Sequence, residues 1–228
     1  MRERVKALLH GDAEQLANWL AAPDRRSVAG CVIIILIGSG LYGFTLGIWR
    51  APLQSLYTAI KFPALIFLTC GGNALLNGML SQILGAGLSF KQASLAILMS
   101  FAIAAIVLAG FSPITLFIWY NAPPLASENA PLGHGLMILA HVCAIAFAGV
   151  MANRRLLDLL RKVSGDSRTA LLVLFSWLAG NLFLGAQLAW NLRPFIGHPS
   201  LPVQFLRDDP LWGNFYEHVW HAFQAVFP

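Results

Sequence analysis

Charged side chains are scarce in this sequence. Only 11% of the 228 residues are Asp, Glu, Lys or Arg, whereas 57% are hydrophobic. A soluble domain usually carries about 25% charged residues, and a globule with so little charge cannot cover its surface with well-solvated side chains. The shortage of charge therefore excludes an ordinary cytosolic enzyme, a disordered chain and a secreted disulfide-rich module. It predicts a polytopic membrane protein.

Cysteines and catalytic motifs are also few. Cys31, Cys70 and Cys143 all lie in apolar runs, and their odd number and spacing fit neither a disulfide framework nor a zinc site. The chain has no Gly-x-Ser-x-Gly, His-Glu-x-x-His or phosphate-binding Gly-Lys-Ser/Thr motif, and no acidic pair for metal-dependent lipid chemistry. We therefore predict no catalytic residue, no cofactor and no metal site, and a protein that is not an enzyme.

The histidines form two pairs that raise the question of a cofactor. His134 and His141 lie two turns apart on one helix face, and His218 and His221 lie one turn apart beside Glu217. Haem ligation across a bundle needs histidines at matched depth on different helices, and a metal site needs more than two well-placed ligands. Neither condition is met in the sequence, so we interpret both pairs as ordinary polar residues.

Five apolar stretches are long enough to cross a bilayer, whose hydrocarbon core of about 30 Å needs roughly 20 residues of helix. No Asp, Glu, Lys or Arg lies in the interior of any of them. The sequence therefore predicts an all-α bundle of five transmembrane helices over residues 28–192, with interfacial amphipathic helices at both ends. The predicted spans are Val28–Trp49, Phe62–Leu84, Ala93–Trp119, Leu132–Asn153 and Ala170–Asn191.

The basic residues predict how the bundle is oriented. Eleven of the fifteen Lys and Arg residues lie before the first span or in the loops after the second and fourth spans. The other four are Arg50, Lys61, Arg193 and Arg207. Because basic loops stay in the cytoplasm, the N-terminus is expected inside and the C-terminus outside. The net charge of +5 is then an orientation signal, and we predict no binding to nucleic acid. We expect the membrane to be a bacterial inner membrane.

The segments on either side of the bundle have helical character. Residues 1–27 form a predicted cytoplasmic amphipathic segment, and the fourth span is expected to continue as a helix to Ser164 and Gly165. In the outer tail, residues 193–228, Asp209 and Pro210 resemble the start of an aromatic helix. Trp and Tyr often dominate interface energies, so we predict that this tail contacts another protein. The candidate contact residues are Arg193, Trp212, Phe215, Tyr216, Trp220 and Phe223.

A polar stripe marks the second span. Thr69, Asn73, Asn77 and Ser81 recur every four residues and share one helix face. An unpaired amide in hydrocarbon costs several kcal/mol, so this face must look into the bundle or toward a partner. Counting from the span ends places Asn73 near the midplane.

Two other polar residues lie at a similar depth, namely His141 on the fourth span and Asn181 on the fifth. A shared cluster with the stripe would either hold helices together by hydrogen bonds or form part of a substrate pathway. We favour the hydrogen-bonding interpretation, because no carboxylate lies in the spans.

The chain resembles the Yip1 family of five-span membrane proteins. The likeness rests on the passage SGLYGFTLG late in the first span, on LYTAIKFPALIFLT at the second, and on the predicted topology, and it covers roughly residues 28–192. The resemblance implies a five-helix membrane bundle. Eukaryotic members are associated with early secretory membranes and Rab-type small GTPases, and the resemblance implies no active-site residue.

These observations favour a non-enzymatic scaffold or assembly subunit of a membrane complex, with membrane organisation or trafficking as the kind of role. The expected partners are the lipid bilayer and, through the C-terminal tail, a second copy of the chain or other membrane subunits. The alternative is an oligomeric pore or passive transporter lined by the stripe of the second span.

The predicted topology can be tested by cysteine labelling. In a background without the three native cysteines, single cysteines at Ser127 and Ser164 should react with a membrane-impermeant thiol reagent from opposite sides. The reagent should reach position 127 from outside and position 164 only after the membrane is opened. Labelling of both positions from the same side would contradict the topology.

Overall fold

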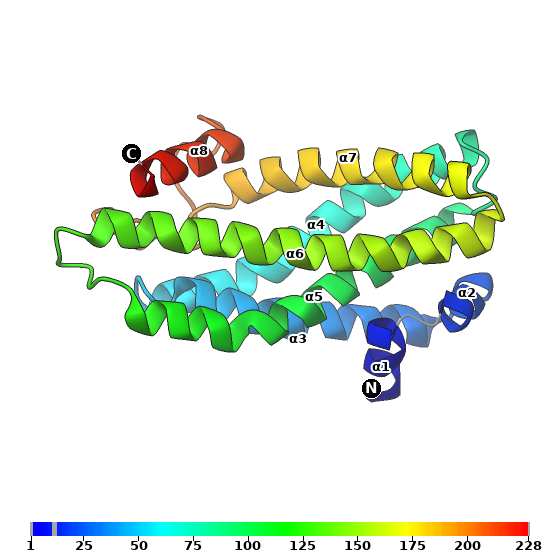
Figure 1. The fold of residues 1–228 in the computed structure, drawn as a ribbon, viewed down its shortest axis with the longest axis horizontal. Coiled ribbons are helices and arrows are strands. Elements are labelled where there is room, and N and C mark those ends of the chain that lie inside the picture. Colours follow the sequence, from blue (N-terminus) through cyan, green and yellow to red (C-terminus); the bar gives the residue numbers. More distant parts are fainter. Residues whose placement is uncertain (1, 11–12, 228) are drawn as a thin grey trace.

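The computed structural model describes residues 2–10 and 13–227, and within them it contains eight α-helices and no strand. Figure 1 shows five long helices side by side, with short helices at both ends of the bundle. The helices are α1 (Arg2–His10), α2 (Ala13–Ala21), α3 (Arg25–Gly47), α4 (Pro52–Ile83), α5 (Phe90–Asn121), α6 (Ala130–Ser164), α7 (Ser167–Asn191) and α8 (Phe215–Val226).

The predicted fold class is confirmed, because α3 to α7 are each long and apolar enough to span a membrane. Around the bundle they follow the order α3, α4, α7, α6, α5, and α5 packs back on α3 to close the ring. α1 and α2 pack against α5 and α6 at the end where the chain begins. The protein is thus an all-helical membrane bundle that exposes large apolar side chains around its sides.

Local sequence signals set several helix ends. The Asp24 carboxylate accepts a hydrogen bond from the backbone N–H of Ser27 at 2.7 Å and so caps α3. Ser89 and Gln92 form a capping box at the start of α5. The end of α6 is confirmed at Ser164, since Gly165 adopts the left-handed conformation with φ of 68° that terminates many helices.

The second span starts ten residues earlier than predicted. It was expected to begin at Phe62, but α4 begins at Pro52 and includes Lys61. The charged and polar residues before Phe62 are typical of a loop. Proline, however, is well tolerated in the first turn of a helix, and Pro52 starts α4. Lys61, which precedes the predicted span, therefore lies inside α4.

Close packing of α3 on α4 fixes the depth of Lys61. A Cβ atom at Gly43 would lie 2.6 Å from the Thr58 carbonyl oxygen, and one at Gly47 would lie 2.5 Å from that of Gln54. Gly40 faces Ala59 and Pro63, which flank Lys61. Lys61 is therefore level with a point about 13 Å along α3 from Trp49, within the half of the bundle that carries the C-terminal tail. This half and this end of the bundle are called outer below, and the opposite ones inner, as names for the two ends alone.

The fifth spanning helix is shorter than its neighbour. α6 and α7 meet at the turn of Gly165 and Asp166, but α6 has 35 residues and α7 only 25. At 1.5 Å per residue, α7 stops about 15 Å before the outer end of α6. The gap above it is filled by the tail and by α8, which runs antiparallel to α6 in Figure 1.

The aromatic helix of the tail begins later than predicted. It was expected to open at Asp209 and Pro210, but α8 starts at Phe215. Gly213 has a φ of 76°, and the Asn214 side chain accepts from the backbone N–H of Glu217 at 2.9 Å, so Asn214 is the true cap. The residues before it are non-helical, and the carbonyls of Asp209, Pro210 and Trp212 accept hydrogen bonds from Arg193, which is described below.

The glycines of α3 give a matched stability test. Gly43→Ala should lower the melting temperature in mild detergent, because overpacking typically costs about 1–3 kcal/mol and Cβ would meet α4 backbone at 2.6 Å. Gly71 of α4 is the matched position, because nothing lies within 4 Å of a Cβ added there. Gly71→Ala should therefore be neutral or stabilising. Equal destabilisation by both variants would contradict the packing.

Candidate functional site

One face of α4 is polar along nearly the whole helix, and all of it is buried. The stripe predicted from the sequence forms the inner half of this face. Further polar residues continue the face toward the outer end of α4 at the same spacing, and they were not predicted as site residues. The α4 polar face consists of Gln54, Thr58, Lys61, Thr69, Asn73, Asn77 and Ser81. α7 covers its inner half and the C-terminal tail covers its outer half.

In the inner half, the structure brings Asn73 and Asn181 together. The Asn73 amide donates to Asn181 Oδ1 at 2.6 Å, and Gly180 of α7 lies beside both asparagines of α4. Asn77 is fully buried, and neither polar atom of its side chain has a hydrogen-bond partner among the described residues. The asparagines therefore face α7 of the same chain.

The remaining members of the predicted cluster bond elsewhere. Thr69 and Ser81 donate to backbone carbonyls of their own helix, those of Leu65 and Gly78. Nδ1 of His141 lies 2.9 Å from the hydroxyl of Tyr42 on α3, and the structure gives it no bond to the asparagines. Three of the six predicted residues thus belong to a pair, namely Asn73 with Asn181 between α4 and α7, and His141 with Tyr42 between α6 and α3. Thr69, Asn77 and Ser81 join neither pair.

In the outer half, Lys61 holds the tail. Its side chain is only 1% exposed, and Nζ donates to the carbonyls of Pro194 and, at 2.8 Å, of Phe205. Nζ also lies 5.2 Å and 5.4 Å from the ring centroids of Phe195 and Phe205. A cation over aromatic faces is stabilised electrostatically. Lys61 is therefore a buried amine whose hydrogen-bond partners are carbonyls of the tail.

Two further α4 side chains bind the same stretch of tail. Gln54 Nε2 donates to the carbonyls of Pro194 at 2.9 Å and Phe195 at 3.0 Å, and the Thr58 hydroxyl donates to that of Phe195 at 2.7 Å. Non-helical backbone at membrane depth has no water to bond, and each unsatisfied group costs several kcal/mol. The outer α4 polar face supplies the missing donors.

Two arginines complete the attachment of the tail. Arg193 donates to the carbonyls of Trp190, Asp209, Pro210 and Trp212 and lies 3.5 Å from the Asp209 carboxylate. Its guanidinium stacks on the Trp190 ring at 4.0 Å. Arg50 binds the carbonyls of residues 198 and 201 at 3.0 and 2.9 Å. The tail is therefore held at several points by side chains of the bundle and by its own Arg193.

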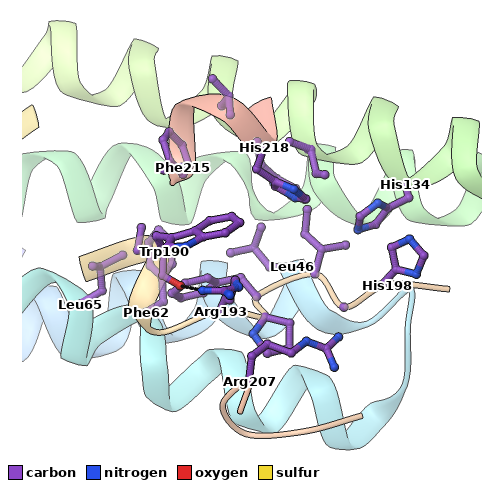
Figure 2. Close-up of a pocket in the computed structure, with 18 of the residues that line it drawn as sticks. Leu46, Phe62, Leu65, His134, Trp190, Arg193, His198, Arg207, Phe215 and His218 are labelled. Carbon is purple, nitrogen blue, oxygen red and sulfur yellow. Dashed lines mark hydrogen bonds between the residues drawn. The ribbon is translucent and has the colours of Figure 1, made fainter. Parts of the chain in front are cut away.

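A cavity of about 260 Å³ lies beneath the tail. Its walls come from α3, α4, α6, α7, α8 and the tail, and most of their surface is apolar. In Figure 2, His134 and His198 lie on one side of the cavity and Trp190 with Arg193 on the other, while His218 lies between them, with its ring centroid 5.6 Å from that of Trp190. The His134 ring centroid is 5.2 Å from that of His198 and 6.3 Å from that of His218.

The electrostatic setting of this cavity disfavours additional positive charge. Loss of hydration lowers the pKa of His198, and Arg207 and Arg50 lower it further. The pKa of His218 is lowered by the same loss of hydration, next by Arg193. Both imidazoles are therefore biased toward the neutral form. In the described part of the chain, no group of three or more His, Cys, Asp or Glu residues is arranged to hold a metal ion.

The predicted contact residues of the tail divide into two groups. Arg193 binds the tail internally, and Phe215 lines the cavity. The rest of the group is exposed: Trp212, Tyr216, Trp220 and Phe223. α8 itself packs on α6, where Ala222 is buried and Val226 lies 3.1 Å from the position of a Cβ at Gly135. The structure thus fixes α8 to its own bundle and leaves an aromatic face uncovered.

Sequence reasoning missed the outer attachment residues Gln54, Thr58 and Lys61. A signal for them exists, because they continue the stripe outward from Thr69 at spacings of three or four residues, interrupted by Leu65. The three histidines of the cavity carry no such signal, since they come from α6, the tail and α8 and meet only in the fold.

Fold and site together define an α-helical polytopic membrane protein whose outer end is closed by its own tail. No family model, no curated protein and no solved structure matches the chain. The resemblance to the Yip1 family therefore stays a prediction.

The role of Lys61 can be tested by substitution. Lys61→Met should leave the Phe205 carbonyl without its donor, and a buried unsatisfied group costs about 1–3 kcal/mol. We expect a lower melting temperature and faster labelling of a cysteine placed at Ser200 in the tail. Lys91→Met, at an exposed position, is the matched control and should change neither. Unchanged tail labelling in Lys61→Met would show that Lys61 does not hold the tail.

Proposed function

We propose that this protein is a non-enzymatic scaffold or assembly subunit of a membrane complex, with a role in membrane organisation or trafficking. The contact surface is the aromatic face of the C-terminal segment, and the partner is a second copy of the chain or another membrane subunit.

The observation that carries the proposal is the rigid attachment of this segment together with its uncovered aromatic face. Residues 193–214 bind the bundle through buried donors, and α8 packs on α6. Trp212 is nevertheless 79% exposed, and Tyr216 and Trp220 are more than half exposed. A segment that is already ordered loses little entropy on binding, and Trp and Tyr are the residues that most often dominate interface energies.

The alternative, a pore lined by the stripe of α4, is less well supported. Thr69, Asn73, Asn77 and Ser81 are all buried against the protein's own helices, and the asparagine at 73 is bonded to α7. A water-filled path along this face would need α7 to move away from α4. These contacts are the ones expected where polar side chains hold two membrane helices together by hydrogen bonds.

The proposal is tested by truncating the aromatic face. The triple variant Trp212→Ala, Tyr216→Ala, Trp220→Ala should reduce the size of the complex isolated in mild detergent, because it removes the central interface side chains. The matched control is Phe117→Ala with Tyr120→Ala, two equally exposed aromatic residues of α5, and it should leave the size unchanged. An unchanged complex in the triple variant would overturn the proposal.

A second comparison separates the scaffold from the pore. Asn73→Leu with Asn77→Leu removes the amides of the stripe while conserving approximate side-chain size. Solute flux into proteoliposomes and complex size are measured on the same preparation. Loss of flux with an intact complex would favour the pore, whereas absence of flux in both wild type and variant agrees with the scaffold.

A further inference from the structure

The cavity beneath the tail changes in character from its outer end to its deeper part. Rings line the outer end, among them those of Trp190 and His134, and eight of the twenty lining residues carry an aromatic or imidazole ring. Aliphatic side chains follow on successive turns of α6, namely Ile138, Val142 and Ile145. From His134 to Ile145 the lining extends along α6 over about 16 Å. A ligand with a ring at one end and a chain at the other would match this order of side chains.

The deeper part of the cavity opens to the side of the bundle. Ile145 lines it from α6 and is also 42% exposed, and Ala189 lines it from α7. One turn further along α6, a Cβ atom added at Gly149 would meet nothing within 4 Å. The cavity can therefore be reached between α6 and α7 from the hydrocarbon region of the membrane. A ligand that enters by this route must be soluble in lipid.

The volume of the cavity suits a substituted ring. An apolar cavity of about 150 Å³ in a protein interior is large enough to bind benzene, and this cavity has a volume of about 260 Å³. The additional volume leaves room for ring substituents and for the first part of a chain. Apolar walls with a few convergent polar groups are also the usual form of a small-molecule site.

Two imidazoles at the outer end have hydrogen-bonding capacity to spare. His134 and His218 form no hydrogen bond with any described residue; their neighbours are the rings of Trp49, His198 and Trp190. The ring centroids of His134 and His218 are 6.3 Å apart. A hydrogen-bonded oxygen lies about 4 Å from the centroid of the donating imidazole, so one oxygen atom can reach both rings. Each neutral imidazole has one N–H to donate, and a carbonyl oxygen can accept both bonds.

The charges at this end of the bundle favour an uncharged ligand. Its four basic residues are matched in number by four acidic ones, so no formal excess of either sign needs a counter-charge. The basic residues are Arg50, Lys61, Arg193 and Arg207, and the acidic ones are Glu128, Asp208, Asp209 and Glu217. Loss of hydration is the main cause that lowers the pKa values of His198 and His218, so both imidazoles are biased toward the neutral form.

We propose that the cavity binds a prenylated quinone, with the ring at the outer end and the chain between α6 and α7. One quinone carbonyl accepts hydrogen bonds from the imidazoles of His134 and His218, and the ring lies among the aromatic side chains of the outer end. The aliphatic walls account for the chain, and the matched charges agree with an uncharged head group. The site is separate from the exposed aromatic face and does not depend on the scaffold proposal.

The test uses the full-length chain, freed of co-purified lipid and held in micelles of an uncharged detergent. It is titrated with decylubiquinone, a quinone with a decyl chain, since quinones quench indole fluorescence at close range. The difference between wild type and Trp190→Phe isolates the signal from the cavity wall. We expect the quenching of this signal to saturate as the quinone fills the cavity. A signal that is not quenched, or whose quenching rises without saturation, would overturn the proposal.

Two sets of variants locate the quinone. His134→Leu with His218→Leu removes both donors and should raise the half-saturating concentration about tenfold, whereas His221→Leu, on α8 but outside the cavity lining, should leave it unchanged. Val142→Phe fills the cavity without changing its polar groups and should abolish the saturable quenching. Val150→Phe, at an exposed position of α6, is its volume-matched control. Saturable quenching retained in Val142→Phe, with an unchanged elution volume, would place the quinone elsewhere and overturn the proposal, as would an unchanged half-saturating concentration in the double variant.

A last arm distinguishes a quinone from other uncharged lipids. Dioleoylglycerol carries ester carbonyls and chains but no ring, and decylbenzene carries a ring and the same chain but no carbonyl. Each should displace decylubiquinone only at a concentration at least about tenfold higher than that of the quinone. Displacement by either compound at an equal concentration would mean that the cavity accepts any neutral chain, and the quinone proposal would then be wrong.

Discussion

The outer half of this bundle depends on one constraint: backbone carbonyls at membrane depth need donors that water cannot supply. α7 ends about 15 Å short of α6, so part of the α4 polar face has no helix to cover it. The tail covers it instead. Because the backbone of the tail is not helical, its carbonyls lack the hydrogen-bond donors that a helix would supply. Lys61, Gln54 and Thr58 provide those donors. A lysine is tolerated in this place because its Nζ is surrounded by carbonyl oxygens and by the faces of two phenylalanines.

The polar face of α4 thus stabilises the fold in two different ways. Its inner part holds two helices together through amides, as Asn73 and Asn181 do. Its outer part holds a helix to an irregular segment through the amine of Lys61 and the side chains of Gln54 and Thr58. The cavity is a product of the second arrangement, because the tail that Lys61 retains also provides the roof and the His198 side of the cavity. A change in the way the tail is attached therefore also changes the shape of the cavity.

Five spans could be predicted from the sequence because length and hydropathy alone define them, and the end of α6 because a glycine after a polar helix is a strong local signal. The start of α4 could not be predicted in this way, because Gln54 and Lys61 lower the hydropathy of a stretch that is nonetheless buried. Burial of these side chains is decided by the tail, more than 130 residues further along the chain. The pairing of Asn73 with Asn181 was within reach of depth counting, whereas that of His141 with Tyr42 was not, because a tyrosine in an apolar span gives no periodic signal.

The short α7 also has a consequence for the order in which the protein is made. The chain is synthesised and inserted from its N-terminus, and Lys61 enters the membrane in α4 long before residues 194 and 205 exist. Until residues 193–214 have been synthesised, the lysine lacks its carbonyl partners and the α4 polar face before Thr69 lacks its cover. Completion of the bundle therefore waits for a segment that is made after all five spanning helices. A chain that stopped before residue 194 would leave Lys61 without its carbonyl partners.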